Sequence, residues 1–378
     1  MGNRTVPLGR YTKIKTGKLD ANASSVDGAY PFFTCSREPL RISSHSYDCE
    51  CVLVAGNGDL NVKYYSGKFD AYQRTYIIES TDNQKLDTRY LYYFLDKYVE
   101  KLREQSIGGV IKYIKLGYLT EAKIPIPPLE VQRKIADVLD RAGALIEKRK
   151  AQIGKLDLLV KSQFIEMFGD PVTNPKGWAI KKLGRVIEGT PQNGLYKPST
   201  DYLSDGSGTP IVRIDAFYDG KLKDIPHFRR LNCTEKEVAL YRLDNQDIVI
   251  NRVNSIEYLG KCAYIEGLSE PTVFESNMMR FKVNRNELHP LFTAKLLCSP
   301  YIYDQIISHA KKAVNQASIN QKDVQDFNLV IPPLTLQNEF ATFVERVETQ
   351  KTLFQQSLAK LELNYKSLMQ KCFAGEVF

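Results

Sequence analysis

The sequence lacks long apolar runs. No stretch approaches the roughly 20 apolar residues that a membrane-spanning helix needs, and Met1-Gly2-Asn3-Arg4 is not followed by the apolar core of a signal peptide. A hydrophobic content of 43% with 25% charged residues is ordinary for a globular protein. We therefore expect a cytoplasmic protein that has no membrane partner.

Cysteine and histidine are scarce and show no metal-binding spacing. The seven cysteines are scattered, and the one close pair, Cys49-Glu50-Cys51, lacks the two-residue gap of a zinc knuckle. The four histidines lie far apart in the sequence, at His45, His227, His289 and His309. We expect reduced, structural thiols and no metal site.

Motifs for catalysis and nucleotide binding are also missing. The sequence has no Gly-x-x-x-x-Gly-Lys-Ser/Thr loop, no Gly-x-Gly-x-x-Gly between strand and helix, no Gly-x-Ser-x-Gly elbow and no His-Glu-x-x-His helix. Asn174-Pro175-Lys176-Gly177 begins like the Asn-Pro-Pro-aromatic motif of amino-methyltransferases but lacks the second proline and the aromatic residue. We interpret it as a turn, and we expect a chain with no catalytic residues and no cofactor of its own.

The sequence does contain a long internal repeat. The motif Ile-Pro-Pro-Leu-x-x-Gln occurs at 126–132 and again at 331–337, an offset of 331 − 126 = 205. Apolar residues then recur in steps of three and four for about 40 residues in each copy, which predicts two helices with one apolar stripe each. Proline is tolerated only in a first helical turn, so each Pro-Pro pair predicts a helix start. The predicted stripe includes Leu145 and is interrupted at Arg149.

The repeat extends to the segments before each helix. Leu8-Gly9-Arg10 is echoed by Leu183-Gly184-Arg185, and between such markers each half reads as short strands and turns. The start offset is 183 − 8 = 175, so the second half has 205 − 175 = 30 extra residues, which we assign mostly to 190–208. We predict an α+β fold with a pseudo-twofold repeat, in which two similar globules are separated by two long antiparallel, coiled-coil-like helices. The expected segments are 1–127, 128–170, 171–332 and 333–378.

The net charge favours a polyanionic partner without proving one. Lys and Arg number 52 against 44 Asp and Glu, a formal charge of +8. Basic, aromatic and amide residues in predicted loops and at strand ends suit contacts to phosphates and base edges. For any one of them, a turn-forming or solvated surface role is the competing interpretation. The candidates are Lys13, Lys15, Asn57, Lys63, Tyr64 and Arg74 in the first globule, and Gln192, Tyr196, Lys197, Arg213, Asn251 and Arg252 in the second.

These features together resemble the specificity (S) subunits of type I restriction-modification systems. The resemblance spans nearly the whole chain. It rests on the two Ile-Pro-Pro-Leu-x-x-Gln helix starts, on the segment 164–171 followed by Asn174-Pro175-Lys176-Gly177-Trp178, and on the ending Phe373-Ala374-Gly375-Glu376.

The resemblance implies a division of labour. It implies two α+β target recognition domains that each bind half of a split, non-palindromic target in double-stranded DNA. It implies two methyltransferase (M) subunits that dock on the helices, with restriction (R) subunits joining them. S-adenosylmethionine, Mg²⁺ and ATP would then belong to those partners and not to this chain.

Some apolar residues lie off the predicted helix stripe and are candidates for partner binding. They are Leu158, Leu159, Ile165, Leu363 and Phe378. A competing hypothesis is a coiled-coil scaffold with two peptide- or protein-binding modules, which explains the helices but not the basic loops. A self-sufficient enzyme would require a catalytic site that the motifs do not reveal.

Overall fold

The computed structural model describes residues 5–218, 220–223 and 225–378. The chain forms two compact units. Unit 1 comprises Met1–Ile153 with Leu353–Phe378, and unit 2 comprises Gly154–Thr352. Each unit therefore contains one globule and one segment of each long helix. Among the described residues, no helix is long and apolar enough to cross a membrane.

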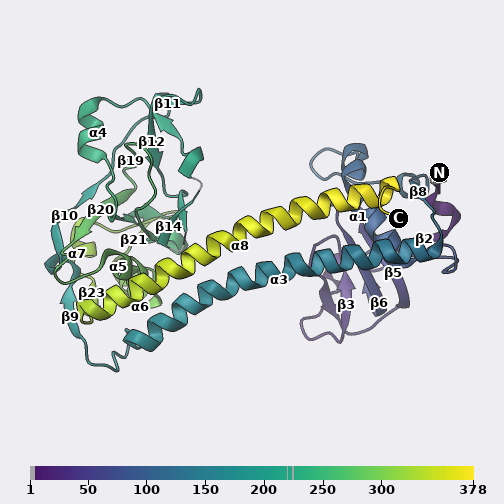
Figure 1. Ribbon diagram of the computed structural model, residues 1–378, viewed down its shortest axis with the longest axis horizontal. Coiled ribbons are helices and arrows are strands. Elements are labelled where there is room, and N and C mark those ends of the chain that lie inside the picture. The colour runs from purple at the N-terminus through teal and green to yellow at the C-terminus, as the bar shows by residue number, and fades with distance from the viewer. Residues whose placement is uncertain (1–4, 219, 224) are drawn as a thin grey trace. The chain divides into compact units, whose positions relative to one another are not determined.

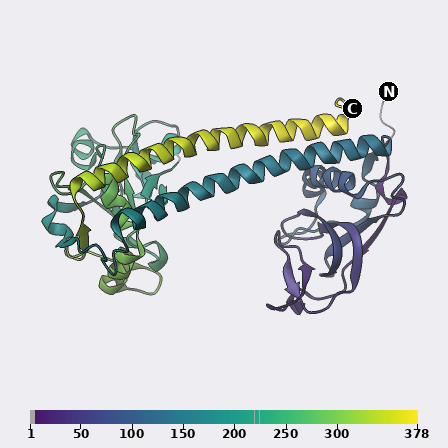
Figure 2. The ribbon, with the colours of Figure 1, turned by 60° about the horizontal axis from the view of Figure 1, so that its bottom comes forward.

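Unit 1 is built on a six-stranded sheet with the order β2-β7-β5-β6-β3-β4. Neighbouring strands are antiparallel except for the parallel pair β6 and β3. Helix α1 (Thr88–Gln105) lies between this sheet and the segments of the two long helices, as Figure 2 shows. The strands are β2 (Thr12–Thr16), β3 (Tyr30–Phe33), β4 (Leu40–Ile42), β5 (Tyr47–Ala55), β6 (Val62–Ala71) and β7 (Thr75–Ser80), with the separate pair β1 (Thr5–Pro7) and β8 (Lys123–Pro125) and the short helix α2 (Leu116–Thr120).

Unit 2 repeats the first four strand positions of this arrangement, whereas its last two strands lie in the sheet in the reverse of their chain order. Its six-stranded sheet has the order β10-β20-β16-β18-β14-β13, again with one parallel pair, β18 and β14, in the fourth position. Helix α5 (Pro290–Leu297) takes the place of α1. The strands are β10 (Ile187–Asn193), β13 (Phe217–Tyr218), β14 (Gly220–Leu222), β16 (Ile248–Asn251), β18 (Cys262–Tyr264) and β20 (Met278–Val283), with the separate pair β9 (Ala179–Lys182) and β23 (Asn328–Ile331). The predicted internal repeat is confirmed.

Unit 2 also contains elements without a counterpart in unit 1, although β12 and β19 pair with each other as β3 and the end of β6 do. A second sheet with the order β11-β15-β12-β19 is accompanied by α4 (Glu235–Tyr241), which starts with a capping box at Thr234. The extra elements therefore extend well past 190–208. The strands are β11 (Tyr202–Leu203), β12 (Thr209–Val212), β15 (Arg230–Leu231) and β19 (Val273–Phe274), and three further short strands are β17 (Val253–Asn254), β21 (Lys311–Lys312) and β22 (Ala317–Ser318). Helix α7 (Gln321–Gln325) repeats α2 at an offset of 205, and α6 (Pro300–His309) follows α5 where unit 1 has the second half of α1.

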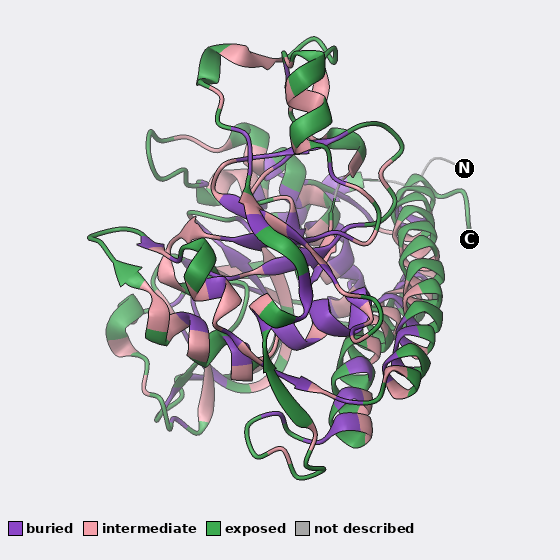
Figure 3. Cartoon of the chain, turned by 90° about the vertical axis from the view of Figure 1, so that its left-hand side faces the viewer, coloured by how far each residue is buried: buried purple, intermediate pink, exposed green. Residues whose placement is uncertain are grey.

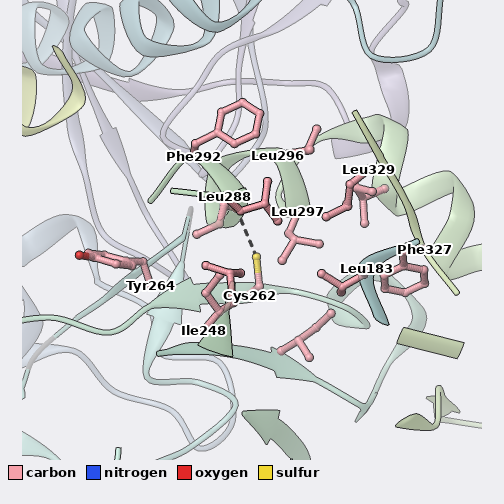
Figure 4. Packing of buried hydrophobic residues seen from close by; sticks show 14 of the residues in the cluster. Leu183, Ile248, Cys262, Tyr264, Leu288, Phe292, Leu296, Leu297, Phe327 and Leu329 are labelled. Atoms are coloured by element: carbon pink, nitrogen blue, oxygen red, sulfur yellow. Dashed lines mark hydrogen bonds between the residues drawn. The ribbon is translucent and has the colours of Figure 1, made fainter. Parts of the chain in front are cut away.

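The two long helices are α3 (Leu129–Phe168) and α8 (Leu334–Ala374), and each begins directly after its Pro-Pro pair. They run antiparallel in both units (Figure 1). In unit 2, Phe164 and Phe168 of α3 form an aromatic cluster with Phe292 of α5 and Phe340 of α8. Figure 4 shows the neighbouring core, where side chains of α5 face Ile248 and Cys262 on the sheet. The central strands β16 and β18 are fully buried, whereas β9 and many of the loops are exposed, and Figure 3 shows this contrast between buried and exposed segments.

The apolar stripe in the middle of α3 differs from the prediction by one residue. Leu145 was placed in the stripe but is 53% exposed, and the adjacent Ile146 is buried instead. A straight helix with 3.6 residues per turn drifts away from a stripe counted in sevens, which explains the shift. At the predicted interruption, the Arg149 guanidinium carbon lies 4.6 Å from the centre of the Phe354 ring. This cation–π contact replaces an apolar contact there.

A fully buried glutamine joins each long helix to its globule. Gln132 Oε1 accepts a hydrogen bond from Asp87 N (3.0 Å), and Gln132 Nε2 donates to Lys85 O (2.8 Å) and Pro127 O (2.9 Å). Asp87 is the N-cap of α1, so the amide ties the start of α1 to the start of α3. The glutamine therefore sets how the helix lies against the globule.

Gln337 makes the same three hydrogen bonds in unit 2. It accepts from His289 N (2.8 Å) and donates to Glu287 O (3.0 Å) and Pro332 O (2.8 Å). The offsets are 337 − 132 = 205 for the glutamines and 289 − 87 = 202 for the N-cap residues. We call Gln132 and Gln337 the helix-start glutamines.

We predict that Gln132→Leu and Gln337→Leu each lower the free energy of unfolding by about 2 kcal/mol or more, because leucine leaves three buried backbone groups without a hydrogen bond. Urea denaturation of the full chain measures this. Gln152→Leu is the matched control, since Gln152 is exposed on α3 and should change the free energy by less than about 0.5 kcal/mol. Equal effects of Gln132→Leu and Gln152→Leu would contradict the assignment.

Candidate nucleic-acid interface

In unit 1, three segments meet where β5 ends. Gly56 N donates to Arg74 O (2.8 Å), Ile114 N donates to Gly56 O (2.9 Å), and Gly58 N donates to Lys112 O (2.9 Å). The turn after β5, the start of β7 and the loop that follows α1 are thus held together by backbone hydrogen bonds. This frame brings together two residues predicted from the sequence, Asn57 and Arg74.

Unit 2 has the same frame. Arg252 N donates to Asn277 O (2.8 Å), and Ile319 N donates to Arg252 O (2.9 Å). The offsets are 319 − 114 = 205 and 252 − 56 = 196, so Arg252 occupies the position of Gly56, and Asn277 that of Arg74. We call residues 56–58, 74 and 107–113 of unit 1, and residues 252–254, 277 and 311–318 of unit 2, the strand-end surfaces.

Each strand-end surface carries a fully exposed valine at a loop tip. Val110 is 104% exposed and Val314 is 99% exposed. An exposed lysine lies two residues from each valine, Lys112 after Val110 and Lys312 before Val314, with Lys311 next to Lys312. An apolar tip beside a cationic side chain suits insertion into a nucleic-acid groove, where lysines meet phosphates and a methyl-bearing side chain meets thymine methyl groups. These two valines were not predicted from the sequence, because they are 314 − 110 = 204 positions apart and the 205-residue offset places Val110 at Asn315.

The candidates of unit 2 gather around the turn 274–278. Arg252 Nη1 donates to Ser276 O (3.1 Å), and Arg280 donates to Gln192 Oε1. Arg213 Nε lies 3.5 Å from Glu275 Oε2, and burial raises the pKa of Glu275. A hollow of about 200 Å³ is lined by the basic side chains Arg213, Lys223 and Arg229, together with Asp215 and apolar residues. This region offers several cationic groups for an anionic ligand.

Three further candidates of unit 2 differ in accessibility. Asn251 is fully buried, and within the described residues its side-chain amide has no hydrogen-bond partner. Tyr196 is exposed. Lys197 Nζ lies 2.9 Å from Glu237 Oε1 and 3.5 Å from Asp201 Oδ2. The charge of Lys197 is therefore already compensated, and the hydrogen bond to Glu237 raises its pKa.

The other candidates of unit 1 do not lie on the strand-end surface. Lys15 on β2 forms an ion pair with Glu79 (2.6 Å), and Lys13 is exposed on the same strand. Tyr64 donates its hydroxyl hydrogen to Glu50 (2.8 Å). Lys63 donates to Asn61, and burial lowers the pKa of Lys63. These residues lie on strands β2 and β6 of the sheet.

The apolar residues predicted to lie off the helix stripe are all exposed. Their exposed fractions range from 44% for Leu159 to 68% for Leu363, with Leu158, Ile165 and Phe378 between them. No group of three or more His, Cys, Asp or Glu residues in the described part of the chain could hold a metal ion.

Comparison with known proteins identifies one family. Residues 6–155 and 175–363 match the family described as "Type I restriction modification DNA specificity domain". The specificity subunit of the type I restriction enzyme EcoDI from Escherichia coli is 30% identical, with 99% of this chain and 88% of that protein aligned. The EcoKI specificity subunit from Escherichia coli strain K12 is 26% identical, with 74% of this chain and 63% of that protein aligned.

Two solved structures share the fold. The S subunit of a type I restriction-modification system from M. genitalium superposes with a TM-score of 0.62 at 16% identity, covering 98% of this chain and 96% of that one. A chain from a study of assembly and conformational transition of the type I R-M system gives a TM-score of 0.59 at 17% identity, covering 100% and 98%.

We predict that Val110→Ser and Val314→Ser leave the free energy of unfolding unchanged within about 0.5 kcal/mol, because fully exposed side chains contribute little to the fold. Urea denaturation checks this, with Val54→Ser in the core of unit 1 as the contrasting variant. A loss above about 1 kcal/mol for either tip variant would show that the valine supports the fold and is not held free for a ligand.

Proposed function

The chain belongs to the family of type I restriction-modification DNA specificity subunits, and on that premise we propose how its two units recognise DNA. Subunits of this family confer DNA specificity and are not themselves catalytic, and this chain has that role. We propose that residues 1–127 and 171–332 are the two target recognition domains. Residues 128–170 and 333–378 are then the helices that connect them.

One observation carries the proposal: two equivalent backbone frames present different side chains. Unit 1 has Gly56 and Arg74 where unit 2 has Arg252 and Asn277. Arginine reads guanine and asparagine reads adenine through paired hydrogen bonds in the major groove. The same frame with different side chains would recognise two different short sequences. The target is then bipartite and non-palindromic double-stranded DNA.

The helices provide the docking surface for partner subunits in this proposal. The exposed apolar residues of α3 and α8 support it, because such rows usually mark interfaces. The partners are two methyltransferase subunits, which restriction subunits join. S-adenosylmethionine, Mg²⁺ and ATP would be bound by those partners, in the cytoplasm. A scaffold with peptide- or protein-binding modules is not favoured, since it gives no role to the exposed valines at the loop tips or to the lysines beside them.

We predict that Arg252→Ala and Arg74→Ala affect opposite halves of the target. Each arginine lies on a different strand-end surface, so loss of a base contact should relax one position in one half and cost about 1–3 kcal/mol. Selection of bound sequences from a random DNA pool by the assembled complex measures this. Relaxation of the same half by both variants, or of neither half, would refute independent recognition.

We also predict that Val110→Ser and Lys112→Gln weaken DNA binding in different ways. The serine variant should lower affinity for the target and leave the salt dependence unchanged, because it removes an apolar contact. The glutamine variant should weaken binding to all sequences and reduce the salt slope by about one, because it removes one phosphate contact. Titrations at several salt concentrations separate the two effects. If neither variant altered binding, this strand-end surface would not face DNA.

A further inference from the structure

Unit 1 contains an open groove that the DNA interface does not use. It lies between α1 and the unit 1 segments of α3 and α8 and has a volume of about 1050 Å³. Tyr92, Tyr93 and Asp96 line it from α1, and Tyr365 and Lys366 line it from α8. We call it the α1 groove.

Asp96 is a carboxylate without a partner in this groove. Within residues 5–218, 220–223 and 225–378, the half-buried Asp96 has no hydrogen bond and no ion pair, and burial raises its pKa although the charge of the nearby Arg103 lowers it. Burial and then the nearby Asp96 raise the pKa of Tyr92 to about 12, and the same two causes raise the pKa of Tyr365. Both phenols therefore lie close to this carboxylate. A carboxylate among tyrosine rings suits a cation, which gains both an ion pair and cation–π contacts.

The internal repeat gives the α1 groove a counterpart in unit 2. The 202-residue offset between the N-caps of α1 and α5 places Asp96 at Cys298. The 205-residue offset places Gly143, which lines the groove on α3, at Glu348 on α8. The two sites can therefore be compared position by position.

In unit 2 this site is covered by the chain itself. Lys221 of β14 forms an ion pair of 2.8 Å with Glu348. A Cβ added to Gly220 would lie 3.4 Å from Cys298 Sγ, so the strand runs directly over the end of α5. An extended strand that carries a lysine thus occupies in unit 2 the place that is open in unit 1.

The groove is open in unit 1 because the described part of that unit has no counterpart of β14. β14 pairs with Ala263 and Tyr264 of β18, beside α5. β3 pairs instead with Asp70 and Ala71 at the end of β6, as β12 of unit 2 pairs with Val273 and Phe274. No strand of unit 1 therefore covers the flank of α1 where Asp96 lies, within the part of the chain that the structure describes.

We propose that the α1 groove of unit 1 receives an extended segment of one methyltransferase subunit, whose lysine or arginine side chain binds Asp96 among the tyrosines. The lysine-bearing strand in the equivalent place of unit 2 identifies the shape and charge of the occupant. The inference rests on the proposed docking of methyltransferase subunits. It adds that the two methyltransferase subunits bind this chain with unequal affinity, because the groove is open in unit 1 and covered in unit 2.

Asp96→Asn tests the inference with little risk to folding, since asparagine has the same size and the half-buried carboxylate has no hydrogen bond or ion pair to lose. The chain is co-expressed with its methyltransferase subunit, and native mass spectrometry gives the stoichiometry at decreasing concentration. The wild-type chain should bind two copies. The variant should bind one of them roughly 30-fold or more weakly, as expected for loss of a buried charge pair. Glu104→Gln, an exposed change on the same helix outside the groove, is the control and should retain both copies.

A second measurement identifies the occupant. A photo-crosslinking amino acid at Lys366 should label a methyltransferase segment that contains lysine or arginine, and Asp96→Asn should abolish that product. The same group at Leu159, in unit 2, should still label the retained copy. Crosslinks from position 366 to the chain itself or to a restriction subunit would overturn the inference, as would equal binding of two copies by wild type and Asp96→Asn. If wild-type chain bound no methyltransferase, the proposed docking would fail as well, so the two failures are distinguishable.

Discussion

The structure depends on one buried amide at the start of each long helix. Gln132 and Gln337 each satisfy one backbone N–H and two backbone carbonyls that would otherwise be buried without partners. One carbonyl belongs to the Pro-Pro pair. The N–H belongs to the N-cap residue of α1 or α5, and the other carbonyl lies two residues before that N-cap. The long helix, the short helix and the sheet beneath it are thereby fixed in one geometry.

The sequence predicted the features that depend on local pattern. Helix starts follow from the Pro-Pro pairs, and the repeat follows from a constant offset, so both agree with the structure. The side of a helix that is buried depends also on what lies opposite it. Leu145 and Ile146 are both apolar neighbours on α3, and only the packing of the unit 1 segments decides that Ile146 is buried.

The candidate site was less predictable for the same reason. Asn251 follows an apolar strand and reads as an exposed turn residue, but pairing of β16 on both sides buries it completely. As an apolar residue Val110 would be expected to be buried, but no other segment in the described part of the chain covers its loop. Burial is set by contacts between residues far apart in sequence, which residue type alone does not reveal. The 205-residue offset of the repeat places Val110 at Asn315, so the repeat does not single out the two tips either.

The extra residues of unit 2 show which parts of the fold tolerate change. The offset between the repeats is 175 at Leu8, 196 at Gly56, 202 at Asp87 and 205 at Gln132, so 196 − 175 = 21 of the 30 extra residues precede the strand-end surface. The backbone hydrogen bonds of that surface and of the helix-start glutamines are the same in both units despite this difference. Insertions are accommodated in loops, where they need not disturb those bonds. The side chains on the frame can therefore differ between units while the frame that positions them stays the same, as a protein that recognises two different half-targets requires.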